Sequence, residues 1–172
     1  MVAEKIVPRA IYAGSLKRQI EMAKIVSSEL HLENVLHLKE PALTEIDYGL
    51  WEGLTNEEIK LKWSAEYRDW VEESKWAEGI FQGKLQDHLH AIEHWLDTLR
   101  QTYNSGDHVL GITSNGIIRF FASFQRDVWD RLTKDRQMEG LKVNTGNLCK
   151  ILLFKDSLIV QKWNLNPMLT KL

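Results

Sequence analysis

Polar residues that could bind and cleave a phosphate ester occur at three points of the 172-residue sequence. Ser15 and Arg18 stand at the start of a helical pattern, where free backbone N–H groups and a guanidinium favour an anion. The Ser-Asn-Gly run at 114–116 repeats this arrangement, and Glu45 lies between the two. A carboxylic acid whose pKa is raised by burial can protonate a leaving alkoxide. Ser15 and Arg18 alone would more often be a solvated helix start, but the three points together predict a phosphate site.

A predicted strand precedes each of these points. The short apolar run 9–13 ends at a Gly-Ser turn, after which apolar residues recur with helical spacing at 16, 20, 23 and 26. A second apolar run, 35–38, leads through Pro41 into an irregular stretch at 43–53 that contains Glu45. A third run, 108–113, is typical of a buried strand and is followed by a turn and a helix from Ile117 onward. Ligands collect at the carboxyl ends of parallel strands, so we expect these loops to share one crevice.

The remaining segments predict two helices and a hairpin. From Asn56 onward, aromatic and apolar residues recur every three or four positions through Trp70, and a second amphipathic pattern covers 85–103. Residues 148–163 alternate in two runs about a polar turn, which predicts a hairpin at a sheet edge. Strands that alternate with helices predict an α/β fold with a mostly parallel sheet, and we expect one domain over residues 1–172.

Composition disfavours several classes of function. The 22 basic and 24 acidic residues are interspersed and leave a net charge of −2, so no nucleic-acid partner is expected. Neither a secretory leader nor a membrane-spanning apolar run is evident, and the single cysteine favours a reducing, cytoplasmic location. The seven tryptophans could stack on bases or sugars, but packing against helices is the favoured interpretation. His90 and His94 could ligate a metal, yet nothing completes the set, so neither metal nor cofactor is expected.

Three motifs carry a resemblance to a known family. Residues 11–18, with Glu21 and Ala23, resemble a segment of the histidine phosphatase superfamily, the phosphoglycerate-mutase-like proteins. Residues 43–55 (LTEIDYGLWEGLT) resemble the acidic loop of that family, and 109–120 resembles its second histidine motif, strand, Ser-His-Gly and helix. The three motifs occur in order and at fitting spacing over nearly the whole chain.

This resemblance implies a three-layer α/β/α fold with a mostly parallel sheet. Members of the family transfer a phosphoryl group to a histidine in an Arg-His-Gly motif after the first strand, and a second histidine and two arginines cradle the phosphate. By resemblance, Arg18 matches one of these arginines, Glu45 the proton donor and Asn115 the place of the second histidine. Ser15 and Gly116 complete the expected phosphate-binding set.

The chain also departs from the family pattern. None of its six histidines lies in an Arg-His-Gly motif, and the few residues before Ala10 leave no room for the first strand, so we expect an N-terminally truncated chain without the nucleophile. Asn115 can donate a hydrogen bond but carries no positive charge. We therefore expect a family member whose phosphoryl transfer on small phosphate monoesters is impaired. The alternative is a non-catalytic module that binds phosphorylated ligands or a protein. Apolar sheet edges left by a missing strand would favour a homo-oligomer.

Overall fold

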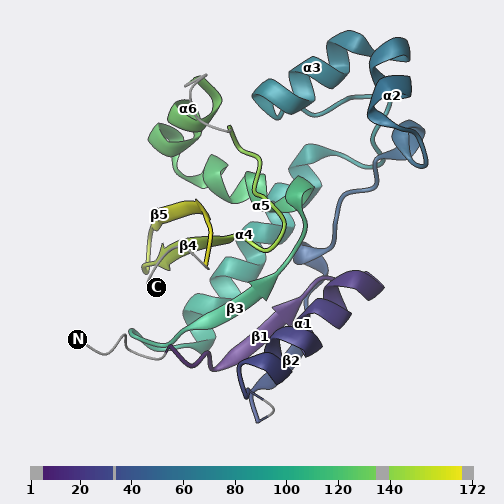
Figure 1. Cartoon of the computed structure of the whole chain (residues 1–172). Helices are drawn as coiled ribbons and strands as arrows, with labels where there is room; N and C mark the ends of the chain where they lie inside the picture. Colours follow the sequence, from purple (N-terminus) through teal and green to yellow (C-terminus); the bar gives the residue numbers. More distant parts are fainter. Residues whose placement is uncertain (1–5, 33, 135–139, 168–172) are drawn as a thin grey trace.

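The computed structural model describes residues 6–32, 34–134 and 140–167 and contains a parallel sheet, drawn in the lower half of Figure 1. Its three strands are β1 (Ala10–Ala13), β2 (Leu36–Lys39) and β3 (Val109–Ile112), in the order β2-β1-β3. Both strand pairs are parallel, and their last residues are aligned, since Ala13 lies opposite Lys39 on one side and opposite Ile112 on the other. The three predicted strands are confirmed, and the chain leaves all of them at the same edge of the sheet.

Helices cover both faces of this sheet. Ile11 and Ala13 of β1 pack with Ala23 of helix α1 (Lys17–Glu29) on one face. Tyr12 points to the other face, where its ring lies 5.5 Å from that of Trp95 in helix α4 (Leu85–Thr102). Alternation along a strand sends successive side chains to opposite faces, so β1 is buried on both. The three-layer α/β/α architecture expected from the sequence is thereby confirmed.

The buried face of α1 differs from the one that the apolar spacing predicts. Gln19, Ala23 and Ser27 are the buried residues of this helix, whereas Ile20 and Val26 are only half-buried. Two polar side chains can face inward because each is hydrogen-bonded there; the Ser27 hydroxyl donates to the carbonyl oxygen of Leu32 at 3.0 Å. Apolar periodicity therefore predicted the position of the helix correctly but predicted the wrong buried face.

The pattern after Asn56 forms two helices instead of one, α2 (Asn56–Lys62) and α3 (Ser64–Glu73). The break occurs at Trp63, whose backbone leaves the helical region at φ −138° and ψ 54°. Hydrogen bonding continues across the break, because the N–H of Trp63 donates to Ile59 and its carbonyl accepts from Tyr67. The change of direction lets Ile59 and Trp70 pack into the same core.

The second strand–turn–helix also differs slightly from expectation. Helix α5 (Asn115–Phe121) begins before Ile117, and a short 3₁₀ turn, η3 (Ala122–Phe124), separates it from helix α6 (Arg126–Lys134). Two further 3₁₀ turns, η1 (Pro41–Leu43) and η2 (Gly49–Trp51), shape the acidic loop.

The predicted hairpin is present as β4 (Leu148–Leu153) and β5 (Leu158–Leu165), which pair antiparallel. The predicted place of the hairpin at the edge of a larger sheet is wrong, because the two strands form a sheet of their own, separate from the one that contains β3. The tryptophans act as packing residues, as expected. Trp51, Trp70, Trp76 and Trp95 are buried in the main core, and Trp63, Trp129 and Trp163 pack against it half-buried. Among the described residues, no helix combines the length and apolar character that crossing a membrane requires.

Candidate functional site

Hydrogen bonds join the three loops at the carboxyl edge of the parallel sheet. The backbone N–H of Ser15, after β1, donates to the Thr44 hydroxyl in the acidic loop at 2.8 Å. The Thr113 hydroxyl, after β3, donates to the carbonyl oxygen of Leu43 at 2.7 Å. The acidic loop is therefore tied to both neighbouring strand ends, and the convergence predicted from the sequence is present.

Gln19 links all three loops through its side-chain amide, and it is only 2% exposed. Its Oε1 accepts from the backbone N–H of Leu16 at 3.2 Å. Its Nε2 donates to the carbonyl oxygen of Leu43 at 2.8 Å and to the Ser114 hydroxyl at 3.0 Å. One buried amide thus fixes the start of α1, the acidic loop and the end of β3 relative to one another.

Gly14 allows this close approach. A Cβ atom at this position would collide with Gln19 Oε1 and would lie 2.5 Å from the carbonyl oxygen of Leu43. Because the second contact is to backbone, a side chain here could not be accommodated by a rotamer change. The Gly-Ser turn of the sequence therefore has a steric reason at its first residue.

Glu45 holds its carboxylate at the centre of the loops, half-buried. Oε1 accepts from the backbone N–H of Ile46 at 3.1 Å, and Oε2 accepts from that of Gly116 at 3.4 Å. Burial raises the pKa of this carboxyl above its ordinary value of 4.5, and the two N–H donors, Arg18 and Arg119 oppose the shift. A carboxyl that holds its proton to a higher pH is suited to donate that proton to a leaving group.

We expect a pH dependence from this raised pKa. Below pH 4.5 the carboxyl is protonated both folded and unfolded, and as the pH rises above 4.5 the unfolded chain loses this proton first. The contribution of Glu45 to stability should therefore be largest at low pH and fall as the pH rises. Urea denaturation between pH 4 and 7 should show that the free energy of unfolding of the unmodified chain falls relative to that of Glu45→Gln. A constant difference between the two proteins would mean that the carboxyl is solvated.

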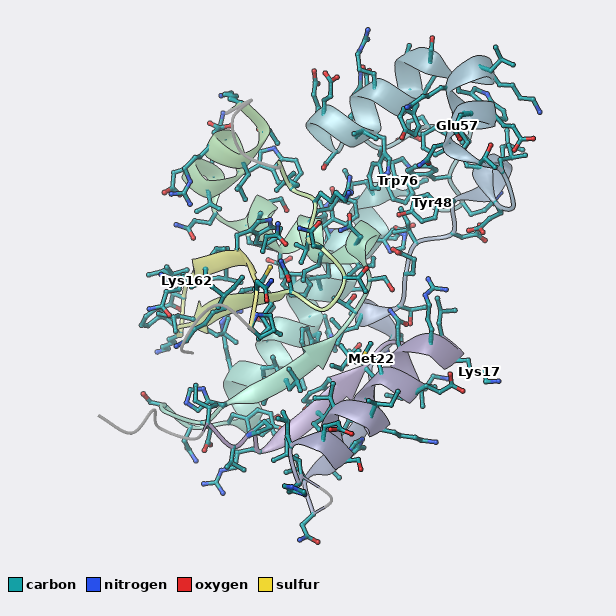
Figure 2. The ribbon with its side chains drawn as sticks, in the orientation of Figure 1. Lys17, Met22, Tyr48, Glu57, Trp76 and Lys162 are labelled. Atoms are coloured by element: carbon teal, nitrogen blue, oxygen red, sulfur yellow. The ribbon has the colours of Figure 1, made fainter. Side chains whose placement is uncertain are left out.

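Gly116 and Tyr48 complete the surroundings of the carboxylate. A Cβ atom on Gly116 would collide with Glu45 Oε1 and would lie 2.8 Å from the Tyr48 hydroxyl oxygen, so both oxygens lie against this glycine. Burial, followed by the charge of Glu45, raises the pKa of Tyr48 well above its usual value. The phenol therefore remains a neutral hydrogen-bond donor beside the carboxyl. Tyr48 and Trp76 both pack edge-on against Phe81, and Figure 2 shows them on the side of the molecule toward α2 and α3.

Arg18 is exposed in the first turn of α1, near enough to Glu45 to lower its pKa. Its guanidinium has no hydrogen bond or ion pair to another residue in the described part of the chain. Lys17, beside it, points away from the fold in Figure 2 and pairs with Glu21 at 3.7 Å. Ser15 is half-buried at the same helix start. Arg18 therefore has free donors next to the carboxyl, whereas Lys17 does not face it.

Asn115, the first residue of α5, has its side-chain amide engaged on both ends. Nδ2 donates to the carbonyl oxygen of Val143 at 2.6 Å. Oδ1 accepts from Nη2 of Arg119 at 2.7 Å. An amide nitrogen carries two hydrogens, so one donor remains after these two bonds.

The histidines lie elsewhere. His88, His90 and His94 lie on α4, His37 is on β2 with its ring bonded to Ser27, and His31 and His108 flank α1 and β3 at the opposite edge of the sheet. Within the described ranges, no histidine borders Glu45, and no group of three or more metal-ligating side chains occurs.

Sequence reasoning identified Glu45, Arg18, Ser15, Asn115 and Gly116, and the structure gathers them around the carboxyl ends of β1 and β3. It missed the roles of Gln19 and Tyr48. Nothing in the sequence indicated that Gln19 is buried, because a polar residue next to Arg18 is also typical of the exposed first turn of a helix. The only available signal was the spacing of Gln19 and Ala23, four apart on one helix face.

Sequence comparison relates the chain to phosphatases. A sequence profile of the histidine phosphatase superfamily (branch 1) matches residues 2–166. Phosphoserine phosphatase 1 of Hydrogenobacter thermophilus is 33% identical over 95 residues, which cover 54% of this chain and 43% of that protein. The matched segment is therefore less than half of the length of this relative.

Structural comparison agrees at the level of the fold. YhfR of Bacillus stearothermophilus superposes with a TM-score of 0.70 at 21% identity, over 94% of this chain and 76% of that one. A mycobacterial glucosyl-3-phosphoglycerate phosphatase gives a TM-score of 0.66 at 16% identity, over 92% and 78% of the two chains. At these identities the likeness concerns the arrangement of helices and strands.

Proposed function

The chain belongs to the histidine phosphatase superfamily, and from this premise we propose that it binds small phosphate monoesters at the Glu45 site, with impaired phosphoryl transfer. The observation that carries the proposal is the half-buried Glu45 carboxyl, with Arg18 unpaired beside it. Arg18 would clamp the phosphate, Glu45 would protonate the leaving alkoxide, and Ser15, Asn115 and Gly116 would line the phosphate pocket. A cytoplasmic location is part of the proposal, supported by the single cysteine.

Impairment follows from what these residues lack. Phosphoryl transfer through a covalent intermediate needs a nucleophile, and no histidine of this sequence stands in an Arg-His-Gly motif. Asn115 offers one amide hydrogen where a histidine would offer a cationic donor, so the transferring group is less stabilised. Binding and charge stabilisation remain available to this chain, and we expect turnover to be slow.

The direct test measures binding and turnover on the same variants. Inorganic phosphate should raise the melting temperature of the unmodified chain, because a ligand that binds only the folded state stabilises it. Arg18→Ala should weaken phosphate binding about tenfold, the size expected for one charge-assisted contact. Glu45→Gln should leave phosphate binding nearly intact and reduce hydrolysis of p-nitrophenyl phosphate about tenfold or more.

Lys17→Ala is the matched control, since Lys17 is a neighbouring exposed cation that points away from the fold (Figure 2). It should change neither phosphate binding nor hydrolysis by more than about twofold. Hydrolysis that survives in both Arg18→Ala and Glu45→Gln would belong to another site or a contaminant, and would contradict the proposal.

A second candidate function is a non-catalytic module that binds phosphorylated ligands or a protein. It is favoured by the engaged Asn115 amide and by the absence of histidine from the described site residues. Phosphate-dependent stabilisation of the unmodified chain, with no hydrolysis above the Glu45→Gln background, would decide for this module.

We further propose that copies of the chain associate through the free edge of β3. In the part of the chain that the structure describes, this strand pairs with β1 alone, and its residues, Val-Leu-Gly-Ile, include no charge or proline of the kind that protects exposed edges. The free edge of β2 differs, since it carries Lys39. Sedimentation at micromolar concentration should show dimers, and hydrogen exchange should slow with concentration in β3 and not in β2. A monomer with unchanged exchange would overturn the proposal.

A further inference from the structure

Arg119 is a buried cation with unusual partners. It is only 6% exposed, yet none of the ion pairs between described residues includes it. A buried guanidinium without hydrogen bonds would be strongly destabilising, so its donors must be satisfied by neutral acceptors. Among the described residues, those acceptors come from the end of α3 and from the first residue of α5.

The first half of the guanidinium binds the end of α3. Nη1 donates to the carbonyl oxygen of Trp70 and to the Ser74 hydroxyl, each at 3.1 Å. The guanidinium also lies 4.1 Å from the centre of the Trp70 ring. Ser74 ends the helix in the left-handed region at φ 53°, and a cation is favoured at this negative end of the helix dipole.

The second half binds Asn115. Nη2 donates to Oδ1 of the Asn115 side chain at 2.7 Å, and Nε donates to the Asn115 carbonyl oxygen at 3.2 Å. Because Arg119 supplies only donors, it requires the oxygen of the amide to face it. The amide nitrogen must then point away from Arg119, and it donates to the carbonyl oxygen of Val143.

We propose that Arg119 is a positioning residue that sets the orientation of the Asn115 amide and links it to the end of α3. This inference rests on the proposed function, since the free hydrogen on Asn115 Nδ2 is the donor offered to a phosphate oxygen. Without the guanidinium only the hydrogen bond to the Val143 carbonyl would hold the amide, so it would rotate more often and present its oxygen, which repels an anion. The residue therefore acts on phosphate through Asn115 and does not touch it.

A double-mutant cycle tests the link. Asn115→Ala and Arg119→Lys should each weaken the binding of inorganic phosphate about fivefold to tenfold, and the double variant should be no weaker than either single one. Lysine keeps the positive charge but lacks the planar guanidinium, so a loss of phosphate affinity in Arg119→Lys reports the orientation of the Asn115 amide and not the charge. Arg68→Lys, the same change at an exposed arginine of α3, should leave affinity within about twofold. Additive losses in the double variant would overturn the proposal.

A second readout does not depend on phosphate. The side-chain amide resonances of Asn115, assigned by their loss in Asn115→Ala, should shift and exchange faster with water in Arg119→Lys. They should also shift in Ser74→Ala, which removes one acceptor of Arg119 at a residue that, among the described hydrogen bonds, does not bond to Asn115. This milder variant decides the case if Arg119→Lys does not fold. Resonances that are unchanged in both variants would refute the link. If the unmodified chain binds no phosphate, the proposed function fails, while the resonances still decide on the positioning role.

Discussion

Gly116→Ala should destabilise the chain by about 1–3 kcal/mol, the cost of forcing a methyl group into a filled space. The added Cβ would collide with Glu45 Oε1 and would lie 2.8 Å from the Tyr48 hydroxyl. Gly116 lies near the start of α5, where helix propensity alone would make alanine about 1 kcal/mol more favourable than glycine. A loss of stability would therefore have the opposite sign to the local effect and would report the contact with Glu45.

The displaced Glu45 carboxyl should also lose its proposed role as the acid that protonates the leaving group. Urea denaturation gives the stability change, and the same variant should show weaker phosphate binding and hydrolysis as low as that of Glu45→Gln. Gly111→Ala is the matched control, because a Cβ on this exposed strand residue would lie 3.4 Å from the Trp95 ring, an ordinary contact. It should change the free energy of unfolding by less than about 1 kcal/mol. A Gly116→Ala protein more stable than the unmodified chain would show that Glu45 does not lie against this glycine.

Gln19→Leu should cost about 2–4 kcal/mol, although leucine has nearly the same size. The substitution removes the acceptor of the Leu16 N–H and both donors to Leu43 and Ser114. Leaving buried polar groups without partners costs about 1–3 kcal/mol for each group. The Leu43 carbonyl still accepts from Thr113, so the largest loss should fall at the start of α1.

Two measurements would check this prediction. Urea denaturation of Gln19→Leu gives the free energy, with Gln101→Leu as the control on the exposed surface of α4, where a change within about 0.5 kcal/mol is expected. Hydrogen exchange should accelerate at the backbone amides of Ser15 and Leu16, because the Gln19 side chain holds this segment against the acidic loop. Equal stability of the two leucine variants would mean that the three loops are held by the strands alone.

Local chain patterns were sufficient for much of the architecture. The strand, turn and helix at 10–29 and at 109–121 follow from short apolar runs, glycine turns and helical spacing, all of which involve residues close in sequence. Their convergence could be predicted as well, because parallel strands place their carboxyl ends at one edge whatever the side chains are. For this reason Glu45, Arg18 and Asn115 could be predicted to lie at the same edge of the sheet before any contact was known.

The helical break at Trp63 and the rotation of α1 were not predictable in the same way. Both depend on which groups find partners across the core. The backbone of Trp63 departs from helical geometry, and the change of direction lets Ile59 and Trp70 pack into the same hydrophobic core. Gln19 faces inward because its partners, Leu43 and Ser114, lie 24 and 95 residues away.

The sequence by itself thus determined the three parallel strands, most of the helices and the edge of the sheet where Glu45 lies, since each depends on local periodicity or on general properties of sheets. Only the tertiary structure decided how the site is held. The hydrogen bonds of Gln19 to Leu16, Leu43 and Ser114, and those of Arg119 to the end of α3 and to Asn115, give partners to buried polar groups. These groups need partners within the protein only because segments distant in sequence pack together and exclude water. Asn115 shows both aspects, because its place was predictable from the motif, whereas its orientation depends on Arg119 and Val143.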